Sequence, residues 1–156
     1  MGTSTIDLTE FFRSDHFIPQ LKARSKDGVL KELAATLVKT EKVRDGELLL
    51  DMLRQREALG STGIGKGVAI PHGRSLAVSE MVVLFARSKK GVAFDAVDEK
   101  PVQLFFLIVA PPNDRANRYL PFLGKLVEIL KDKDNREKLL GAGDFEDVAE
   151  VLRETR

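Results

Sequence analysis

The stretch Val102-Gln103-Leu104-Phe105-Phe106-Leu107-Ile108-Val109 has the length of a strand and is apolar on both faces. A second run of this kind covers residues 81–86, and a shorter one, residues 68–70, stops at Pro71. Strands that are apolar on both faces are typical of the middle of a sheet that helices cover on each side. The pattern therefore predicts a buried central sheet.

Helix signals flank these strands. Apolar residues recur at helical spacing from Ser25 to about Thr40 and again after Asp45, and Ser25 and Asp45 are both suited to capping a helix N-terminus. Further helices are predicted over about residues 117–131, 136–140 and 144–153. Smaller predicted elements are a helical patch over residues 6–12, a short edge strand at 17–18 and a minor strand at 92–94. Helices before, between and after buried strands predict an α/β sandwich.

The composition excludes several classes of protein. The 156 residues include 25 Lys and Arg against 24 Asp and Glu, a net charge of +1, and no cysteine. A chain so close to neutral lacks the basic face that general nucleic-acid binding needs, and without cysteine there is no disulfide or thiolate chemistry. No apolar run approaches the roughly 18 residues of a membrane span, and the N-terminus does not resemble a signal peptide. We therefore expect one cytoplasmic domain, residues 1–156, without membrane insertion.

Positive charge is concentrated in one part of the chain. Residues 54–90 contain seven basic and two acidic side chains, a surplus of five, whereas residues 1–60 contain ten of each. One interpretation is a site for an anionic ligand or an acidic partner, and the other is a chance cluster on exposed loops. The seven basic residues are Arg54, Arg56, Lys66, Arg74, Arg87, Lys89 and Lys90.

The chain has two histidines, and they differ in context. His16 stands beside Phe17 in a polar stretch and is interpreted as a surface residue. His72 follows a short apolar strand and Pro71 and precedes Gly73, which leaves its ring unobstructed. Because α/β folds place their sites at strand ends, His72 is the candidate functional residue, although a histidine that merely closes a turn fits the same spacing.

The chemistry open to His72 is limited by what surrounds it in sequence. No HxxxH or HExxH spacing supports a metal site, and no G-x-S-x-G elbow supplies a serine nucleophile. The remaining interpretation is that the imidazole is itself the nucleophile and accepts a phosphoryl group. Backbone N–H groups of the glycine-rich loop 61–67 and nearby arginines can stabilise the charge of that group.

Other motifs in this region have simpler interpretations. The glycine-rich loop is not a Walker A motif, which requires Lys followed by Ser or Thr, and a strand rather than a helix follows it, so nucleotide binding is disfavoured. Asp95 and Asp98 can be read as a paired-carboxylate site but are more typical of turn residues. Lys89 and Lys90 are interpreted as a solvated turn, or less simply as a contact for an acidic carrier face.

Residues 56–73, Arg-Glu-Ala-Leu-Gly-Ser-Thr-Gly-Ile-Gly-Lys-Gly-Val-Ala-Ile-Pro-His-Gly, closely resemble the signature of fructose/mannitol-type IIA domains. These domains belong to the bacterial phosphoenolpyruvate-dependent phosphotransferase system. The Ser-Thr-Gly-Ile-Gly core and residues 92–98 look most like the nitrogen-regulatory branch. The resemblance covers nearly the whole chain and implies an α/β fold with a mixed β-sheet of about four to five strands flanked by helices.

The resemblance also implies roles for particular residues. His72 looks like the family's phosphorylated histidine, which takes its phosphoryl group from an HPr-like phosphocarrier, and Arg56 matches the arginine that stabilises that group. Ser61, Thr62 and Gly63 would lie beside the phosphate, with the Thr62 hydroxyl as a donor. One departure is Tyr119, which stands where relatives often carry a second histidine. A tyrosine can donate a hydrogen bond but cannot become cationic, and a ring packed on an amphipathic helix is the other interpretation.

Two functions within this system, and one outside it, follow as hypotheses. The first is a phosphoryl carrier whose phosphorylation switches contacts with a regulated target protein. The second is a stand-alone IIA component that passes phosphate to a sugar-specific IIB component. The third is a protein-interaction module that is not phosphorylated. None of them requires a cofactor or a metal.

Overall fold

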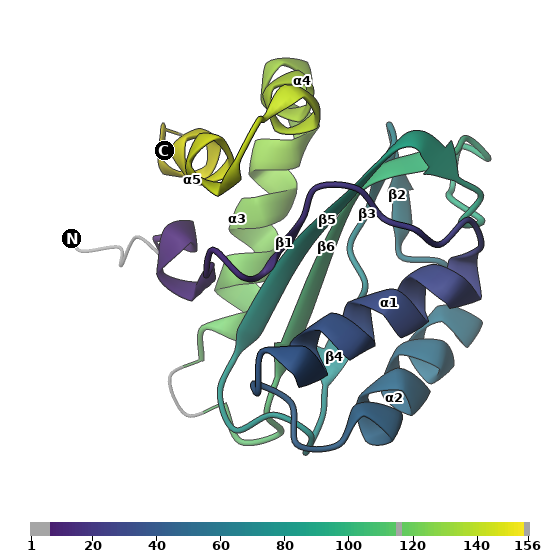
Figure 1. The fold of residues 1–156 in the computed structure, drawn as a ribbon, viewed down its shortest axis with the longest axis vertical. Helices are drawn as coiled ribbons and strands as arrows, with labels where there is room; N and C mark the ends of the chain where they lie inside the picture. Colours follow the sequence, from purple (N-terminus) through teal and green to yellow (C-terminus); the bar gives the residue numbers. More distant parts are fainter. Residues whose placement is uncertain (1–6, 115–116, 155–156) are drawn as a thin grey trace.

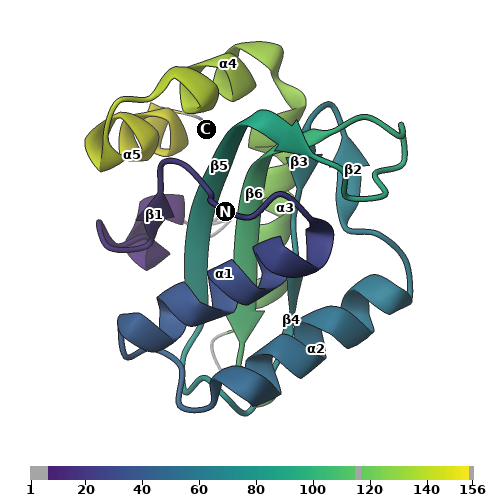
Figure 2. The same ribbon diagram turned by 45° about the vertical axis from the view of Figure 1, so that its right-hand side comes forward.

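The computed structural model describes residues 7–114 and 117–154. In chain order its elements are η1 (Leu8–Phe11), β1 (Phe17–Ile18), α1 (Lys26–Lys39), α2 (Gly46–Ala58), β2 (Gly63–Gly65), β3 (Val68–Ala69), β4 (His72–Arg74), β5 (Val82–Val92), β6 (Val102–Ala110), α3 (Tyr119–Lys131), α4 (Lys133–Gly141) and α5 (Phe145–Glu154). Helices lie on both sides of one sheet, as Figures 1 and 2 show, so the predicted α/β class is confirmed.

The sheet is mixed and open. Its order is β1-β5-β6-β3-β2, and β4 also pairs with β6. The long strands β5 and β6 are antiparallel, β1 lies parallel to β5, β3 and β4 lie parallel to β6, and β2 is antiparallel to β3. The six strands exceed the four to five expected because β2 and β4 are short and contain glycine, so neither has an apolar pattern.

Each long strand alternates its side chains between two cores. Phe105 and Leu107 of β6 face one core, which contains the buried side chains of α1 and α2. Phe106 and Ile108 face the other, which contains those of α3 and residues of α4 and α5. Both cores are needed to bury a strand that is apolar throughout, which explains why the two predicted central strands lie in the middle of the sheet.

The predicted helix starts agree with the caps that the structure shows. The side chain of Ser25 accepts a hydrogen bond from the Gly28 N–H at 3.1 Å, and that of Asp45 accepts one from the Leu48 N–H at 3.1 Å. Asp144 accepts one from the Asp147 N–H at 3.0 Å, as predicted for the last helix.

Two helices begin at other residues than predicted. The helix expected from residue 117 begins at Tyr119, because a carboxylate oxygen of Asp114 accepts the Arg118 and Tyr119 N–H groups at 3.1 and 3.0 Å. The helix expected over 136–140 begins at Lys133, capped by the side chain of Asp132. Carboxylates that lie just outside the apolar stripe therefore set these boundaries.

Three smaller predictions need correction. The helical patch expected over 6–12 is a 3₁₀ turn, Leu8–Phe11, capped by Asp7. Residue 6 of the expected patch lies outside the described residues. The minor strand expected at 92–94 is the end of β5, where Val92 pairs with Val102. The loop expected over 61–67 includes β2, which pairs with β3.

His16 is not the surface residue that its polar neighbours suggested. Its side chain is 1% exposed, and its Nε2 lies 2.9 Å from the Thr40 hydroxyl oxygen. Its backbone carbonyl accepts the Phe85 N–H at 3.0 Å, which places it alongside β5. The prediction was wrong because this backbone pairing, invisible in local composition, carries the ring into the interior.

Candidate functional site

β3 and β4 run along β6 as one interrupted strand. Val68 pairs with Leu104 and His72 with Ile108, so the register on β6 is the same before and after the interruption. Pro71 cannot donate to the ladder, but its carbonyl accepts the Ile108 N–H at 3.0 Å. His72 is therefore fixed by backbone pairing to the most central strand of the sheet.

The backbone also fixes which nitrogen of His72 is free. Nδ1 lies 2.6 Å from the Ile70 carbonyl oxygen. A carbonyl oxygen can only accept, so Nδ1 carries the proton and donates it. The lone pair of the neutral ring is then on Nε2, and the half-buried ring presents a nucleophilic nitrogen.

Tyr119 and Arg74 lie on the same side of the sheet as His72. The rings of His72 and Tyr119 have centroids 6.4 Å apart, and the guanidinium carbon of Arg74 lies 4.8 Å from the Tyr119 ring centroid. In a strand, residues two apart face the same way, which is why Arg74 accompanies His72. The sequence interpretation counted Arg74 only as one of seven charges. Treating residues 68–74 as one strand would have placed Arg74 on the same face as His72.

Arg56 lies in the last turn of α2. Its Nη1 donates to the Gly60 carbonyl at 2.8 Å, which holds the guanidinium at the start of the glycine-rich loop. Burial raises the pKa of the Tyr119 hydroxyl, and the charges of Arg74 and Arg56 both oppose that rise. The charge of Arg56 acts on the Tyr119 hydroxyl less strongly than that of Arg74, and the role of Arg56 at a phosphoryl group stays a prediction.

The loop residues expected beside a phosphate use their donors within the protein. The Ser61 hydroxyl donates to the Phe94 carbonyl at 2.7 Å and accepts the Gly63 N–H at 3.0 Å. The N–H and the hydroxyl of Thr62 both donate to the buried carboxylate of Glu57. Sequence reasoning missed Glu57, which nothing in its local pattern marks as buried.

Gly73 serves packing rather than access to His72. A Cβ atom at this position would lie 2.3 Å from the Met52 sulfur, so the absence of a side chain lets α2 lie against β4. The expectation that Gly73 keeps the histidine ring unobstructed is therefore replaced by a contact on the opposite face of the strand. Figure 2 shows α2 beside β4 in this arrangement.

The positive residues of 54–90 do not all belong to the site. Arg54 is exposed and paired with Asp27, with Nε 2.8 Å from a carboxylate oxygen. Arg87 is buried and donates to the carbonyls of Pro19, Leu139, Leu140 and Ala142. The charge surplus therefore combines residues from different parts of the fold: Arg74 lies against Tyr119, whereas Arg87 is a buried structural guanidinium elsewhere.

The two aspartates considered as acid–base partners are turn residues in the structure. Asp98 accepts the Lys66 and Lys100 N–H groups at 2.9 and 3.1 Å, and these bonds lower the pKa of its carboxyl. Asp95 is exposed with a φ of 54° and lies 3.5 Å from the Lys26 amine. This geometry supports the turn interpretation.

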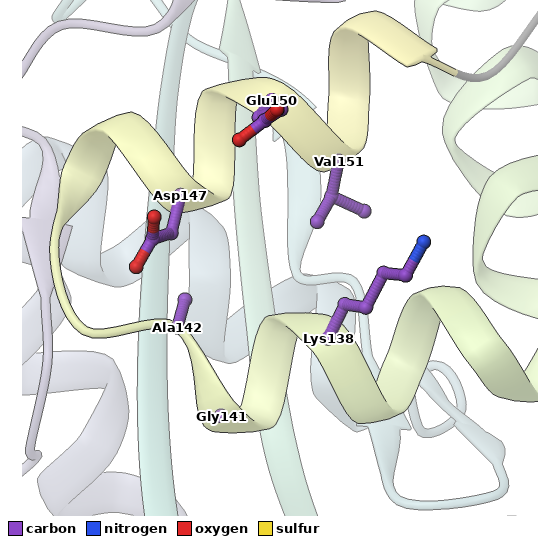
Figure 3. Close-up of a pocket in the computed structure, with 6 residues that line it drawn as sticks. All are labelled: Lys138, Gly141, Ala142, Asp147, Glu150 and Val151. Atoms are coloured by element: carbon purple, nitrogen blue, oxygen red, sulfur yellow. The ribbon is translucent and has the colours of Figure 1, made fainter.

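A separate pocket of about 380 Å³ lies between α4 and α5. Figure 3 shows Lys138 of α4 opposite Val151 of α5, and Asp147 opposite Ala142. None of the residues around His72 lines it. Within residues 7–114 and 117–154, no group of three His, Asp or Glu side chains is arranged to hold a metal ion, and no helix there is long and apolar enough to cross a membrane.

His72, Tyr119 and Arg74 thus place an imidazole, a phenol and a guanidinium together on one face of the sheet, and a guanidinium can bind an anionic group such as a phosphoryl group. The sequence matches the family described as Phosphoenolpyruvate-dependent sugar phosphotransferase system, EIIA 2, over residues 10–155, and the chain belongs to that family. It is therefore a IIA-type component of the phosphotransferase system, and the family predicted from the signature is confirmed.

Its relatives include both branches that the sequence suggested. The chain is 40% identical to a PTS system fructose-specific EIIA component of Haloferax volcanii over 130 residues, 83% of this chain and 84% of the relative. It is 34% identical to a nitrogen regulatory protein of Bradyrhizobium diazoefficiens over 145 residues, 93% of this chain and 94% of the relative. The crystal structure of nitrogen regulatory protein IIA-Ntr from Neisseria meningitidis superposes with a TM-score of 0.85 at 34% identity, covering 93% of this chain and 98% of that one.

Proposed function

We propose that His72 carries the phosphoryl group on Nε2, received from the phosphohistidine of an HPr-like carrier protein. The single observation that supports this most is the 2.6 Å contact between Nδ1 and the Ile70 carbonyl, which leaves Nε2 as the nucleophile. Family membership supplies the reaction class, and the geometry supplies the atom.

In this proposal the Nε2 lone pair forms the new P–N bond, and the electron pair of the broken P–N bond stays with the donor's imidazole. The proton stays on Nδ1, hydrogen-bonded to the Ile70 carbonyl, throughout the transfer, so His72 needs no general base. The carbonyl dipole also stabilises the positive charge that the ring gains on phosphorylation.

Arg56 and Arg74 balance the charge on the three phosphoryl oxygens, and Tyr119 closes the site beside them. Loop residues Ser61–Gly63 form its wall. Because Thr62 and Gly63 direct their donors to protein acceptors, the guanidinium groups provide most of the stabilisation in this scheme.

We further propose that phosphorylation regulates protein contacts, the role suggested by the nitrogen-regulatory relatives and by the superposition on IIA-Ntr. A phosphoryl group replaces a surplus of positive charge around His72 by a near balance, which changes the partner that binds there. The alternative, transfer onward to a IIB component in sugar uptake, is favoured by the fructose-specific relative. Either role operates in the cytoplasm, where phosphoenolpyruvate is available.

The test of His72 is intact mass after incubation with phosphoenolpyruvate, the first enzyme of the system and an HPr-like carrier. We expect an acid-labile gain of one phosphoryl group that is lost in His72→Ala and kept in His16→Gln, the other histidine of the chain. No labelling of the wild type would support the interaction-module hypothesis instead. Labelling that persists in His72→Ala would assign the acceptor elsewhere.

The two roles are separated by a pull-down with phosphorylated and unphosphorylated protein. A target that binds one form and is neither phosphorylated nor a IIB component supports regulation. Recovery of a IIB component or a membrane permease, with transfer of the phosphoryl group to the IIB component, supports delivery to a sugar.

A further inference from the structure

Glu57 is a buried carboxylate at the C-terminal end of α2, next in sequence to Arg56. Its side chain is 5% exposed. A carboxylate is costly to bury unless it is paired and hydrogen-bonded, so the partners of Glu57 show what the burial maintains. Lys26 of α1 supplies the countercharge, with its amine nitrogen 2.9 Å from a Glu57 oxygen.

The remaining partners of Glu57 belong to the loop that precedes β2. The Thr62 N–H lies 3.2 Å from both carboxylate oxygens, and the Thr62 hydroxyl donates to one of them. Thr62 is itself buried, so these donors would be left without water if Glu57 were removed. One side chain of α2 therefore fixes the position of this loop residue.

Two further hydrogen bonds connect Thr62 to the imidazole. The Thr62 carbonyl accepts the Ile70 N–H at 3.0 Å, and the Ile70 carbonyl accepts from Nδ1 of His72 at 2.6 Å. The β2–β3 pairing, Gly63 opposite Ala69, holds the two backbone segments together at this point. The series Glu57, Thr62, Ile70, His72 is unbroken from the helix to the ring.

We propose that Glu57 is a positioning residue for His72: by fixing Thr62 it fixes the Ile70 carbonyl, and thereby the tautomer and the orientation of the imidazole. This inference rests on the proposed function of His72. It assigns to the ion pair of Lys26 with the buried Glu57 a task beyond joining α1 to α2, because Nε2 keeps its lone pair only while Nδ1 holds the proton and donates it in a hydrogen bond to the Ile70 carbonyl.

The tautomer of His72 in the unphosphorylated protein is the readout that distinguishes positioning from a general loss of stability. Imidazole ¹⁵N chemical shifts report which nitrogen carries the proton, with no phosphoryl donor present. We expect the Nδ1–H form in the wild type, a mixture of the two tautomers in Glu57→Ala, and less change in Glu57→Gln, whose amide oxygen can still accept from Thr62. Single-turnover transfer from the phosphorylated carrier should slow about 10- to 100-fold in Glu57→Ala, as for other residues that orient a reacting group, with little change in the carrier concentration at half-maximal rate.

Two control variants make the result decisive. Glu47→Gln changes an exposed glutamate of the same helix and should leave the tautomer and the rate unchanged. Leu130→Ala removes a buried side chain from the other core and lowers the free energy of unfolding without touching the series of hydrogen bonds. It should leave the tautomer unchanged.

The outcomes separate this inference from the function on which it rests. An unchanged tautomer and rate in a folded Glu57→Ala protein would overturn the positioning role, as would a shift of the same size in Leu130→Ala. If wild-type His72 accepts no phosphoryl group, the proposed function fails, while the ¹⁵N measurement still decides whether Glu57 sets the tautomer.

Discussion

The guanidinium group of Arg74 lies over the ring of Tyr119, with the guanidinium carbon 4.8 Å from the ring centroid. The same ring is 6.4 Å from that of His72. One aromatic side chain is thus in contact with the cation and next to the imidazole. Because Tyr119 is the only tyrosine and the chain has no tryptophan, its titration can be followed without interference.

Arg74→Ala should raise the pKa of the Tyr119 hydroxyl. Burial already raises it, and the positive charge of Arg74 is the largest opposing influence, so removing that charge leaves burial less opposed. The measurement is the near-ultraviolet absorbance of tyrosinate as a function of pH, with Arg54→Ala as the control because Arg54 is paired with Asp27 elsewhere on the surface. A lower pKa in Arg74→Ala would show that Arg74 does not act on Tyr119 as described.

Arg56→Ala should slow phosphoryl acceptance by His72, on the order of 10²-fold, while the fold is retained. The reason is that a fixed guanidinium near the developing charge is lost while α2 keeps its packing residues. Rapid-quench transfer from the phosphorylated carrier measures the rate, and circular dichroism checks the fold. The control is Arg54→Ala, two residues earlier in α2, where the side chain is exposed and paired with Asp27. This variant should accept the phosphoryl group at the wild-type rate. Equal rates for Arg56→Ala and wild type would remove Arg56 from the mechanism.

Gly73→Ala should lower the free energy of unfolding by about 1 kcal/mol, because the new methyl group displaces the flexible end of the Met52 side chain between α2 and β4. Met52→Ala makes room on the other side, so the double variant should lose less stability than the sum of the two single changes. Urea unfolding of the four proteins measures this coupling. Strict additivity would mean that the two side chains do not compete for the same space.

Arg87→Ala should lower the free energy of unfolding by about 3 kcal/mol or more. Arg87 is 5% exposed, and its guanidinium donates to the carbonyls of Pro19, Leu139, Leu140 and Ala142. The Leu139 carbonyl also accepts the Ala142 N–H at 3.4 Å, but the other buried carbonyls would lose the donor that Arg87 supplies. Arg87→Lys keeps the charge but supplies fewer directed donors, so its free energy of unfolding should lie between those of the wild type and Arg87→Ala. Thermal and urea unfolding test the order of the three proteins, and phosphoryl transfer per folded molecule should not change.

His16 should make the protein less stable in mild acid. Burial is the main reason why the pKa of His16 lies below the unfolded-chain value of 6.5, with Asp15 opposing that effect and Arg13 adding to it. The unfolded chain therefore binds the proton more tightly, so the contribution of His16 to stability is complete above about pH 6.5 and decreases as the pH falls toward the pKa of the folded state. In His16→Gln the free energy of unfolding should decrease less between about pH 7 and pH 5. Parallel pH profiles for the two proteins would contradict this prediction.

The elements that the sequence predicts well are those whose signals are local. The apolar runs of β5 and β6 require cover on both faces, and the caps at Ser25, Asp45 and Asp144 start their helices as expected. The strands that it does not predict, β2 and β4, exist because their backbones find partners in β3 and β6. Such pairing depends on residues distant in sequence, and a glycine-rich segment has no side-chain pattern to indicate it.

The same division applies to the site. The signature around His72 identifies the family and the candidate acceptor, and the charge surplus points to Arg56. The burial of Glu57 and the position of Arg74 over Tyr119 depend on how α2, β4 and α3 meet, which is a tertiary relationship. For His16 the local sequence was misleading. Its neighbours are polar, which suggested a surface position, but the ring is buried in the fold.

The constant register of β3 and β4 on β6 has a consequence for how the length of the chain can vary. Val68 and His72 pair with residues of β6 that are likewise four positions apart, so no residue is gained or lost at Pro71. Inserting or deleting one residue between them would exchange the faces of His72 and Gly73, turning the imidazole toward Met52 and away from Tyr119. Changes in length are thus more tolerable at the exposed Lys66 before β3, or at the exposed Ser79 and Glu80 before β5, than inside this segment. The pairing with β6 therefore fixes the number of residues from Val68 to His72, even where the residues themselves can change.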